Sequence, residues 1–130
     1  MTHTRLLAAA ACLAALCVSA APAQAATGWG PISSPNGVAT AKGKVVTQDE
    51  DNSFQATLKR NKPGCAWLVV DVREDTADWH TLRFSQCGAG SRDISKLFYE
   101  ANWIKVRVCD GTAAKPVTCT PMKTLSLGAV

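Results

Sequence analysis

Few side chains in this chain combine the residue types and spacing that catalysis requires. Apart from His3, near the first residue, His80 is the one histidine, and Asp78 lies close to it. A serine hydrolase needs a nucleophile in a strained turn beside such a pair, and no serine occupies one. A glycosidase needs two carboxylates across a cleft, whereas Glu74, Asp75 and Asp78 share one polar turn. We therefore expect no catalytic residues and no enzyme activity.

The chain begins with the pattern of a secretory signal peptide. A short start ending in Arg5 precedes the apolar run from Leu6 to Ala21, and Ala23-Gln24-Ala25 forms an A-x-A cleavage site. The run is shorter than the ~20 residues that a membrane-spanning helix needs. We expect residues 1–25 to be removed and the mature protein to be secreted, without a membrane anchor.

The cysteine count indicates disulfides rather than metal binding. Cleavage would remove Cys12 and Cys17 from the six cysteines of the chain. The four that remain are Cys65, Cys87, Cys109 and Cys119. An even number in a short exported chain is typical of a disulfide framework. Zinc is disfavoured, because there is no C-x-x-C spacing and only His80 could assist. We expect no metal and no cofactor.

The stretch from Cys65 to Cys87 predicts a β-hairpin closed by its own two cysteines. Both cysteines are equidistant from Thr76, which lies in the polar turn 73–78. Folding about Thr76 places two apolar pairs on the core face, Leu68 with Phe84 and Val70 with Leu82. The other face then carries the pairs Trp67 with Ser85, Val69 with Arg83, and Asp71 with Thr81. Opposed residues are close enough for a disulfide, so one register satisfies both the apolar alternation and the bridge.

A second cysteine pair predicts a second closed hairpin. Residues 103–109 alternate, with Ile104, Val106 and Val108 toward the core, and Cys109 and Cys119 are symmetric about Ala114. Simple pairing would place Lys105 opposite Lys123, so we expect a bulge near Pro121 that shifts the last strand by one residue. The candidate core residues of that strand are Met122, Leu125 and Leu127.

The remaining segments predict further strands. Residues 38–47 and 54–60 form a hairpin around the acidic turn 48–53, which lacks the spacing of a calcium loop. Residues 92–98 predict a short strand with Ile94 and Phe98 inward, and one helical turn at 95–99 is the alternative. Residues 26–36 predict an extended lead-in with an edge strand at most, in which Trp29 covers one end of the core.

Together these segments predict one small all-β domain, an immunoglobulin-like antiparallel sandwich of six or seven strands with two disulfides, spanning residues 37–130. No apolar period of 3.6 residues is sustained beyond the signal peptide. Loss of Arg5 would leave 13 basic side chains against 10 acidic ones. This small, dispersed excess does not indicate binding to nucleic acid or an anionic membrane.

Two resemblances follow from short motifs. Leu97, followed six residues later by Trp103 and an alternating strand, resembles the tyrosine-corner approach of fibronectin type III and other immunoglobulin-like domains. The turn 71–78, the Cys-Gly-x-Gly-Ser step 87–91 and the V-R-V-C strand 106–109 resemble small secreted actinobacterial proteins without an assigned function. These resemblances imply a secreted all-β domain and add no activity.

The residues best suited to binding are aromatic. Trp67 is expected on the outer face of the central hairpin beside Arg83, and Trp79 beside the acidic turn; alternatively, Trp67 covers the disulfide or lies beneath a second sheet. We expect a monomeric secreted binding domain for a cell-wall or environmental polysaccharide or for another protein. The alternative is an inhibitor of an extracellular enzyme, acting through loop 73–79 or loop 110–116.

The paired-cysteine framework predicts that reduction unfolds the domain. Each bridge would restrict the unfolded chain by about 3 kcal/mol, a sizeable share of the 5–15 kcal/mol typical of a domain. Thermal melting with and without reductant measures this effect. An unchanged melting temperature would contradict the framework.

Overall fold

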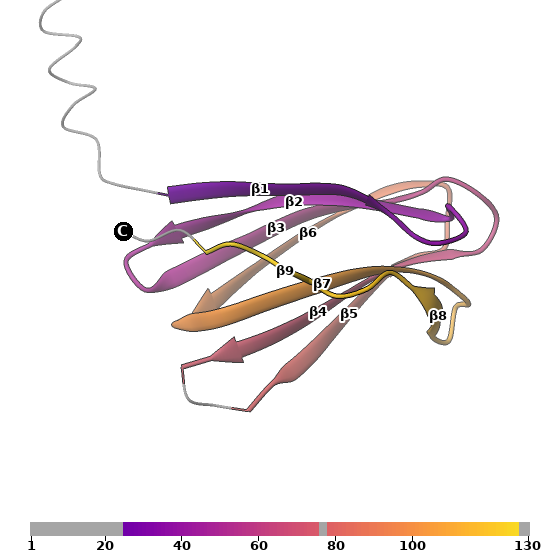
Figure 1. The fold of residues 1–130 in the computed structure, drawn as a ribbon. Helices are drawn as coiled ribbons and strands as arrows, with labels where there is room; N and C mark the ends of the chain where they lie inside the picture. The colour runs from indigo at the N-terminus through magenta and orange to yellow at the C-terminus, as the bar shows by residue number, and fades with distance from the viewer. Residues whose placement is uncertain (1–24, 76–77, 128–130) are drawn as a thin grey trace, which may run out of the picture.

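The computed structural model describes residues 25–75 and 78–127, which form two antiparallel sheets packed face to face (Figure 1). The predicted signal peptide, except Ala25, and the predicted turn centre Thr76 lie outside these residues. The described part contains nine strands, and none of it forms a helix that could cross a membrane. The predicted all-β sandwich with two disulfides is confirmed, with nine strands rather than six or seven.

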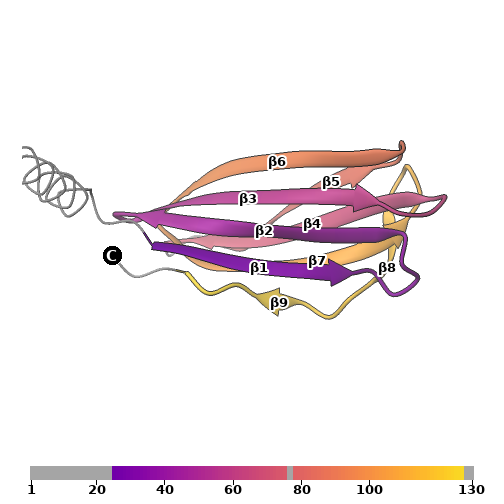
Figure 2. The same cartoon turned by 90° about the horizontal axis from the view of Figure 1, so that it is seen from above.

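The strands divide between the sheets in an interleaved order. Sheet A contains, in spatial order, β1 (Ala25–Ser33), β2 (Ala39–Gln48), β3 (Asp51–Arg60) and β6 (Gly90–Tyr99). Sheet B contains β5 (His80–Gln86), β4 (Cys65–Glu74), β7 (Ala101–Gly111) and β8 (Pro116–Cys119), and β9 (Lys123–Thr124) also pairs with β7. The chain crosses between layers after β3, β5 and β6, as the view from above shows (Figure 2). Residues far apart in sequence therefore become strand neighbours.

The central hairpin has the predicted register. Leu68 lies opposite Phe84 and Val70 opposite Leu82, while Val69 faces Arg83 on the other side of the sheet. The bridge Cys65–Cys87 closes the open end. Alternation places Leu68 and Val70 in the core, and both are fully buried. The hairpin prediction is confirmed in its strands, register and bridge.

The core between the sheets is built around aromatic rings. Phe54 of β3 stacks on Trp29 of β1 with ring centroids 5.8 Å apart, and its ring centroid lies 6.2 Å from that of Phe98 on the neighbouring strand β6. Trp29 pairs with Gly43 of β2, where an added Cβ would lie 1.9 Å from the Gln55 carbonyl oxygen. Glycine is therefore required at position 43, because β3 approaches it too closely for any side chain.

Two segments extend further than the sequence predicts. The segment expected as a lead-in forms β1, a full edge strand that carries Trp29 into the core. β6 runs through residues 95–99, which excludes the alternative of a helical turn there. Ile94 and Phe98 face inward, as predicted. Both segments are longer because β2 and β3 offer them continuous pairing partners.

The last strand shows the predicted shift. Lys105 pairs with Thr124 instead of Lys123, so the two lysines are not directly opposed. Leu125 is buried and Leu127 packs against the core, but Met122 is exposed. The prediction that Met122 belongs to the core is wrong. β8 ends at Cys119 and β9 begins only at Lys123, so the period-2 pattern does not continue through Met122.

A buried carboxylate fastens sheet A to sheet B at the disulfide end. Asp110 of β7 accepts hydrogen bonds from the Ser34 hydroxyl, from the Asn36 N–H at 2.7 Å and from the Val38 N–H at 3.1 Å. Burial raises the pKa of Asp110, but these hydrogen bonds to the charged form outweigh it, and the net pKa is lowered. The β1–β2 loop therefore depends on an ionised Asp110.

Replacing Asp110 with Asn tests this contact. We expect Asp110→Asn to lower the free energy of unfolding at pH 7 by about 2–3 kcal/mol, because an amide NH₂ would face backbone donors. A lowered pKa stabilises the folded state above the unfolded value of about 3.9, and this contribution is lost as pH falls through the folded value. Urea unfolding measured from pH 7 to pH 2 should show the free energies of unfolding of wild type and Asp110→Asn converging in acid. Parallel stability curves would contradict the proposed contact.

Candidate functional site

The disulfide end of sheet B is closed by a small apolar cluster on the outer face. Cys65, Trp67, Val69 and Cys109 are buried together, and Cys119 packs against them. The bridges Cys65–Cys87 and Cys109–Cys119 are both formed, as predicted, and are consistent with an oxidising extracellular setting.

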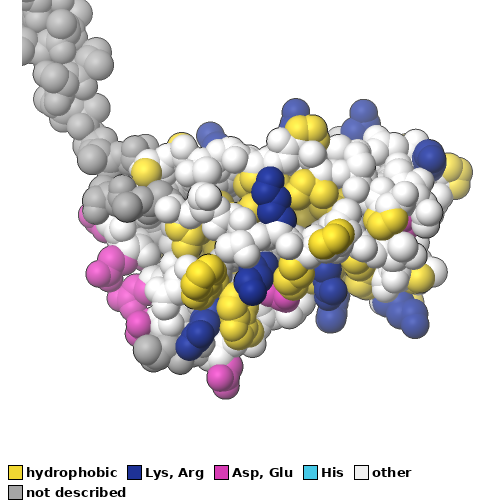
Figure 3. All heavy atoms as spheres, viewed as in Figure 1, with side chains coloured by type: hydrophobic (Ala, Val, Ile, Leu, Met, Phe, Trp, Pro, Cys, Tyr) yellow, Lys and Arg dark blue, Asp and Glu magenta, His cyan; other side chains and the backbone are white. Residues whose placement is uncertain are grey.

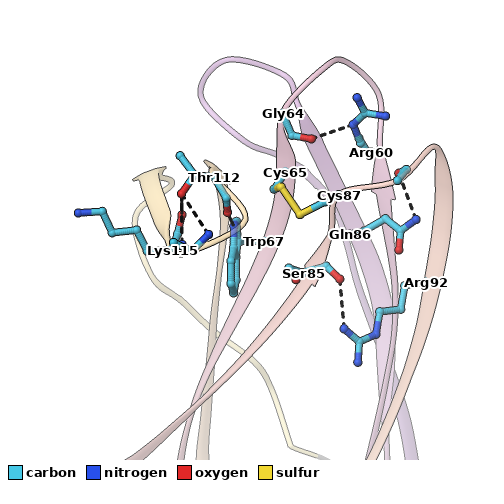
Figure 4. Close-up of a disulfide and its surroundings, with 12 residues drawn as sticks. Arg60, Gly64, Cys65, Trp67, Ser85, Gln86, Cys87, Arg92, Thr112 and Lys115 are labelled. Atoms are coloured by element: carbon cyan, nitrogen blue, oxygen red, sulfur yellow. Dashed lines mark hydrogen bonds between the residues drawn. A yellow bond between two sulfur atoms is a disulfide. The ribbon is translucent and has the colours of Figure 1, made fainter.

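Trp67 is part of this cluster and is not an open platform. Its side chain is 8% exposed, and its Nε1–H donates to the Thr112 carbonyl oxygen at 2.8 Å. Figure 4 shows the indole standing between the Cys65–Cys87 bridge and the loop that carries Thr112 and Lys115. Of the three placements considered for Trp67, an open position on the outer face is wrong, and the one in which it covers the disulfide agrees with the structure, so its ring is not accessible for stacking on a ligand.

The outer face of sheet B is open toward its other end, where β4 ends and β5 begins. We call this region the basic aromatic face, and it consists of Arg73, Trp79, Arg83, Trp103, Lys105 and Arg107. Trp79 and Trp103 are 42% and 47% exposed. The Lys105 ammonium lies 4.7 Å from the centre of the Trp79 ring, which holds the two side chains together across β4.

The three arginines of this face lack side-chain partners. Within the described residues, the side chains of Arg73, Arg83 and Arg107 make no hydrogen bond or ion pair. The one carboxylate on this face, Asp71, instead accepts a 2.5 Å hydrogen bond from the Thr81 hydroxyl. The basic aromatic face therefore carries an excess of positive charge beside two half-exposed rings, because Asp71 balances only one of its four cations.

The structure brings two of the three predicted binding residues onto one face. Trp79 and Arg83 both belong to the basic aromatic face, whereas Trp67 does not. The sequence prediction missed Trp103, although the signal was present. Trp103 alternates in phase with Lys105, so it must share the outward face of that strand.

His80 lies at the start of β5 in a solvated position. Its Nε2 is 3.4 Å from Glu74 Oε1, and its side chain is 45% exposed. Val72 is its strand partner, as the register predicted. A hydroxyl or thiol nucleophile does not hydrogen-bond to His80 in the described part of the chain, so a Ser-His-acid arrangement is not assembled around it.

Acidic side chains gather where β2 turns into β3, at one end of the sandwich (Figure 3). A hollow of about 380 Å³ there is lined by Glu50, Asp75 and Glu100 among others. The hydrogen bond that protonated Glu100 donates to Glu50, together with the negative charges of Glu50, Asp75 and Asp51, raises the pKa of Glu100. Across residues 25–75 and 78–127, no three His, Cys, Asp or Glu side chains converge as metal ligands would.

A second hollow, of about 800 Å³, lies on sheet A. Gly28 and Gly30 of β1 leave its floor without side chains, and Lys42, Lys44 and Asp93 are among its walls. Thr57 donates a 3.0 Å hydrogen bond to Asp93 at one side. The lining mixes polar and apolar residues and carries no half-exposed aromatic ring, which distinguishes this hollow from the basic aromatic face.

In comparisons with known proteins, no family model, curated protein or solved structure matched this chain at a significant level.

Trp67 and Trp79, the two tryptophans predicted from the sequence to bind a ligand, should differ in how much each stabilises the fold. Trp67→Ala removes a buried ring and should lower the free energy of unfolding by about 3–5 kcal/mol. Trp79→Ala removes a half-exposed ring and one cation–π contact, so the loss should stay below about 1 kcal/mol. Urea unfolding followed by circular dichroism measures both. Equal losses would show that Trp79 also supports the fold.

Proposed function

We propose that the mature chain is a secreted, monomeric, non-enzymatic binding domain whose ligand lies on the basic aromatic face. The ligand is a cell-wall or environmental polysaccharide; another secreted protein is the alternative partner. The observation that carries this proposal is the half-exposed pair Trp79 and Trp103 beside arginines whose side chains have no partner among the described residues.

Exposed tryptophans on a sheet face have a physical role outside the core. Burying an indole ring against a sugar ring or an apolar partner surface removes a large apolar area from water. Trp79 directly precedes β5 and Trp103 lies on β7, and these two strands flank β4, so they are about 10 Å apart, two strand spacings. A flat layer with two spaced rings suits an extended ligand better than a compact one.

A second candidate function is supported by the loop at the disulfide end. Thr112 organises this loop: its N–H donates to the Lys115 carbonyl oxygen at 2.9 Å, and its hydroxyl oxygen accepts from the Ala114 and Lys115 N–H groups. Trp67 and the Cys109–Cys119 bridge support the loop from below. Such a preorganised loop with an exposed Lys115 would suit an inhibitor of an extracellular enzyme.

A pull-down tests the proposed function. Mature wild type, Trp79→Ala and Trp103→Ala would be mixed with insoluble cell wall, chitin and cellulose, and separately with secreted proteins of the producing organism. We expect wild type to be retained on a polymer and each variant to lose most of that retention, because each ring contributes its burial and about 0.5–1.5 kcal/mol of stacking beyond it.

Tyr99→Ala provides the matched control, since Tyr99 is 62% exposed but belongs to sheet A. Its retention should equal that of wild type. Equal retention of the tryptophan variants would remove the basic aromatic face from the proposal. A single protein partner whose capture depends on Lys115 would favour the inhibitor function instead.

A further inference from the structure

We propose that the basic aromatic face binds an acidic polysaccharide, with its guanidinium groups pairing with carboxylates of the sugar chain. This inference deepens the proposed function and rests on it. It assigns a charge and a chemical class to the ligand, which the tryptophans alone do not.

The basic aromatic face carries more cations than carboxylates. Arg83 and Arg107 lie on either side of Val69, each directly opposite it in the register. One row further along β4 and β7, Lys105 lies opposite Asp71. Four cations, with Arg73, therefore share a face with the single carboxylate of Asp71, which the Thr81 hydroxyl already binds.

The two arginines beside Val69 have unpaired guanidinium groups. Arg83 and Arg107 lie opposite Val69 on the two neighbouring strands, and Val69 itself is buried within the apolar cluster of the disulfide end. Arg83 is exposed and Arg107 is half-buried. The Nε of Arg107 is buried and has no hydrogen-bond partner in the described part of the chain, and neither guanidinium group has a protein acceptor there. An unpaired guanidinium is well suited to bind a carboxylate with two parallel hydrogen bonds.

Cations and an aromatic ring follow one another along strand β7. Arg107 and Trp103 are four residues apart on β7, which corresponds to roughly 13 Å along an extended strand. Lys105 lies between them, with its ammonium over the Trp79 ring. One extended chain crossing the face would therefore meet cations and rings in succession. A polymer with a carboxylate on each sugar ring satisfies both kinds of contact.

An acidic protein is the less suitable ligand for this face. Protein partners usually anchor a side chain in a desolvated pocket. The hollows described above open on sheet A and at the acidic end, and the six side chains of the basic aromatic face line neither of them. A flat layer with unpaired guanidinium groups offers stacking and carboxylate pairing along its length, which favours a glycan.

The test compares polygalacturonate with its fully methyl-esterified form, which has the same backbone without the charge. Isothermal titration with the mature protein should give at least tenfold tighter binding to polygalacturonate, and this preference should decline as salt is raised. Arg83→Gln/Arg107→Gln should weaken binding to polygalacturonate by tenfold or more and leave binding to the ester within about twofold.

The matched control is Lys42→Gln/Lys44→Gln, which removes the same charge from the outer face of sheet A. It should bind polygalacturonate within about twofold of wild type. An equal loss in this control would mean non-specific charge attraction and overturn the proposal. Thermal melting confirms that each variant is folded.

The remaining outcomes separate the two proposals. If Trp103→Ala abolishes binding to both polymers while esterification makes no difference, the binding face stands and the acidic ligand is overturned. If wild type binds poly-glutamate or poly-deoxythymidine as tightly as polygalacturonate, the glycan class is overturned. Failure to bind polygalacturonate at all also overturns it.

Discussion

Strand β4 is the constraint on which the rest of sheet B depends. Its first six residues are buried on both faces, and β5 and β7 both take their register from it. Val70 lies between Leu82 and Val106, so a slip of one residue would turn every core side chain of a neighbouring strand outward. The Cys65–Cys87 bridge fixes that register at one end. Every outward residue on β5 and β7 is therefore positioned by its partner on β4.

The outward side chains of β4 change from apolar to charged along the strand, and this change determines which part of the outer face of sheet B is accessible to solvent. Trp67 and Val69 are apolar and buried, whereas Asp71 and Arg73 are charged and partly exposed. At the apolar end the outer face is covered by the Thr112 loop and the two bridges. At the charged end it is left uncovered. The basic aromatic face begins where the apolar alternation on this side of β4 ends.

The sequence determined local features better than long-range ones. Alternation and the symmetric cysteines were enough to predict the β4–β5 register, and the unfavourable opposition of Lys105 and Lys123 was enough to predict the shift in the last strand. The burial of Trp67 could not be read in this way, because it depends on Thr112, 45 residues away. The contact of Asp110 with Ser34 spans 76 residues. Trp103 joins Trp79 on one face only because β7 pairs with β4, which local patterns do not reveal.

The charged group that stabilises the fold has protein partners, whereas the charged groups that we assign to binding have none among the described residues. Asp110 is buried and fully hydrogen-bonded, so its charge serves the fold. Arg83 and Arg107 lie opposite Val69, and their guanidinium groups have no acceptor within the described residues, so their charge contributes little to the folded state. Four cations on one layer repel one another, and the one carboxylate among them is bound by Thr81. An acidic ligand would relieve that repulsion and pair the free guanidinium groups at once, without disturbing a contact that the fold needs.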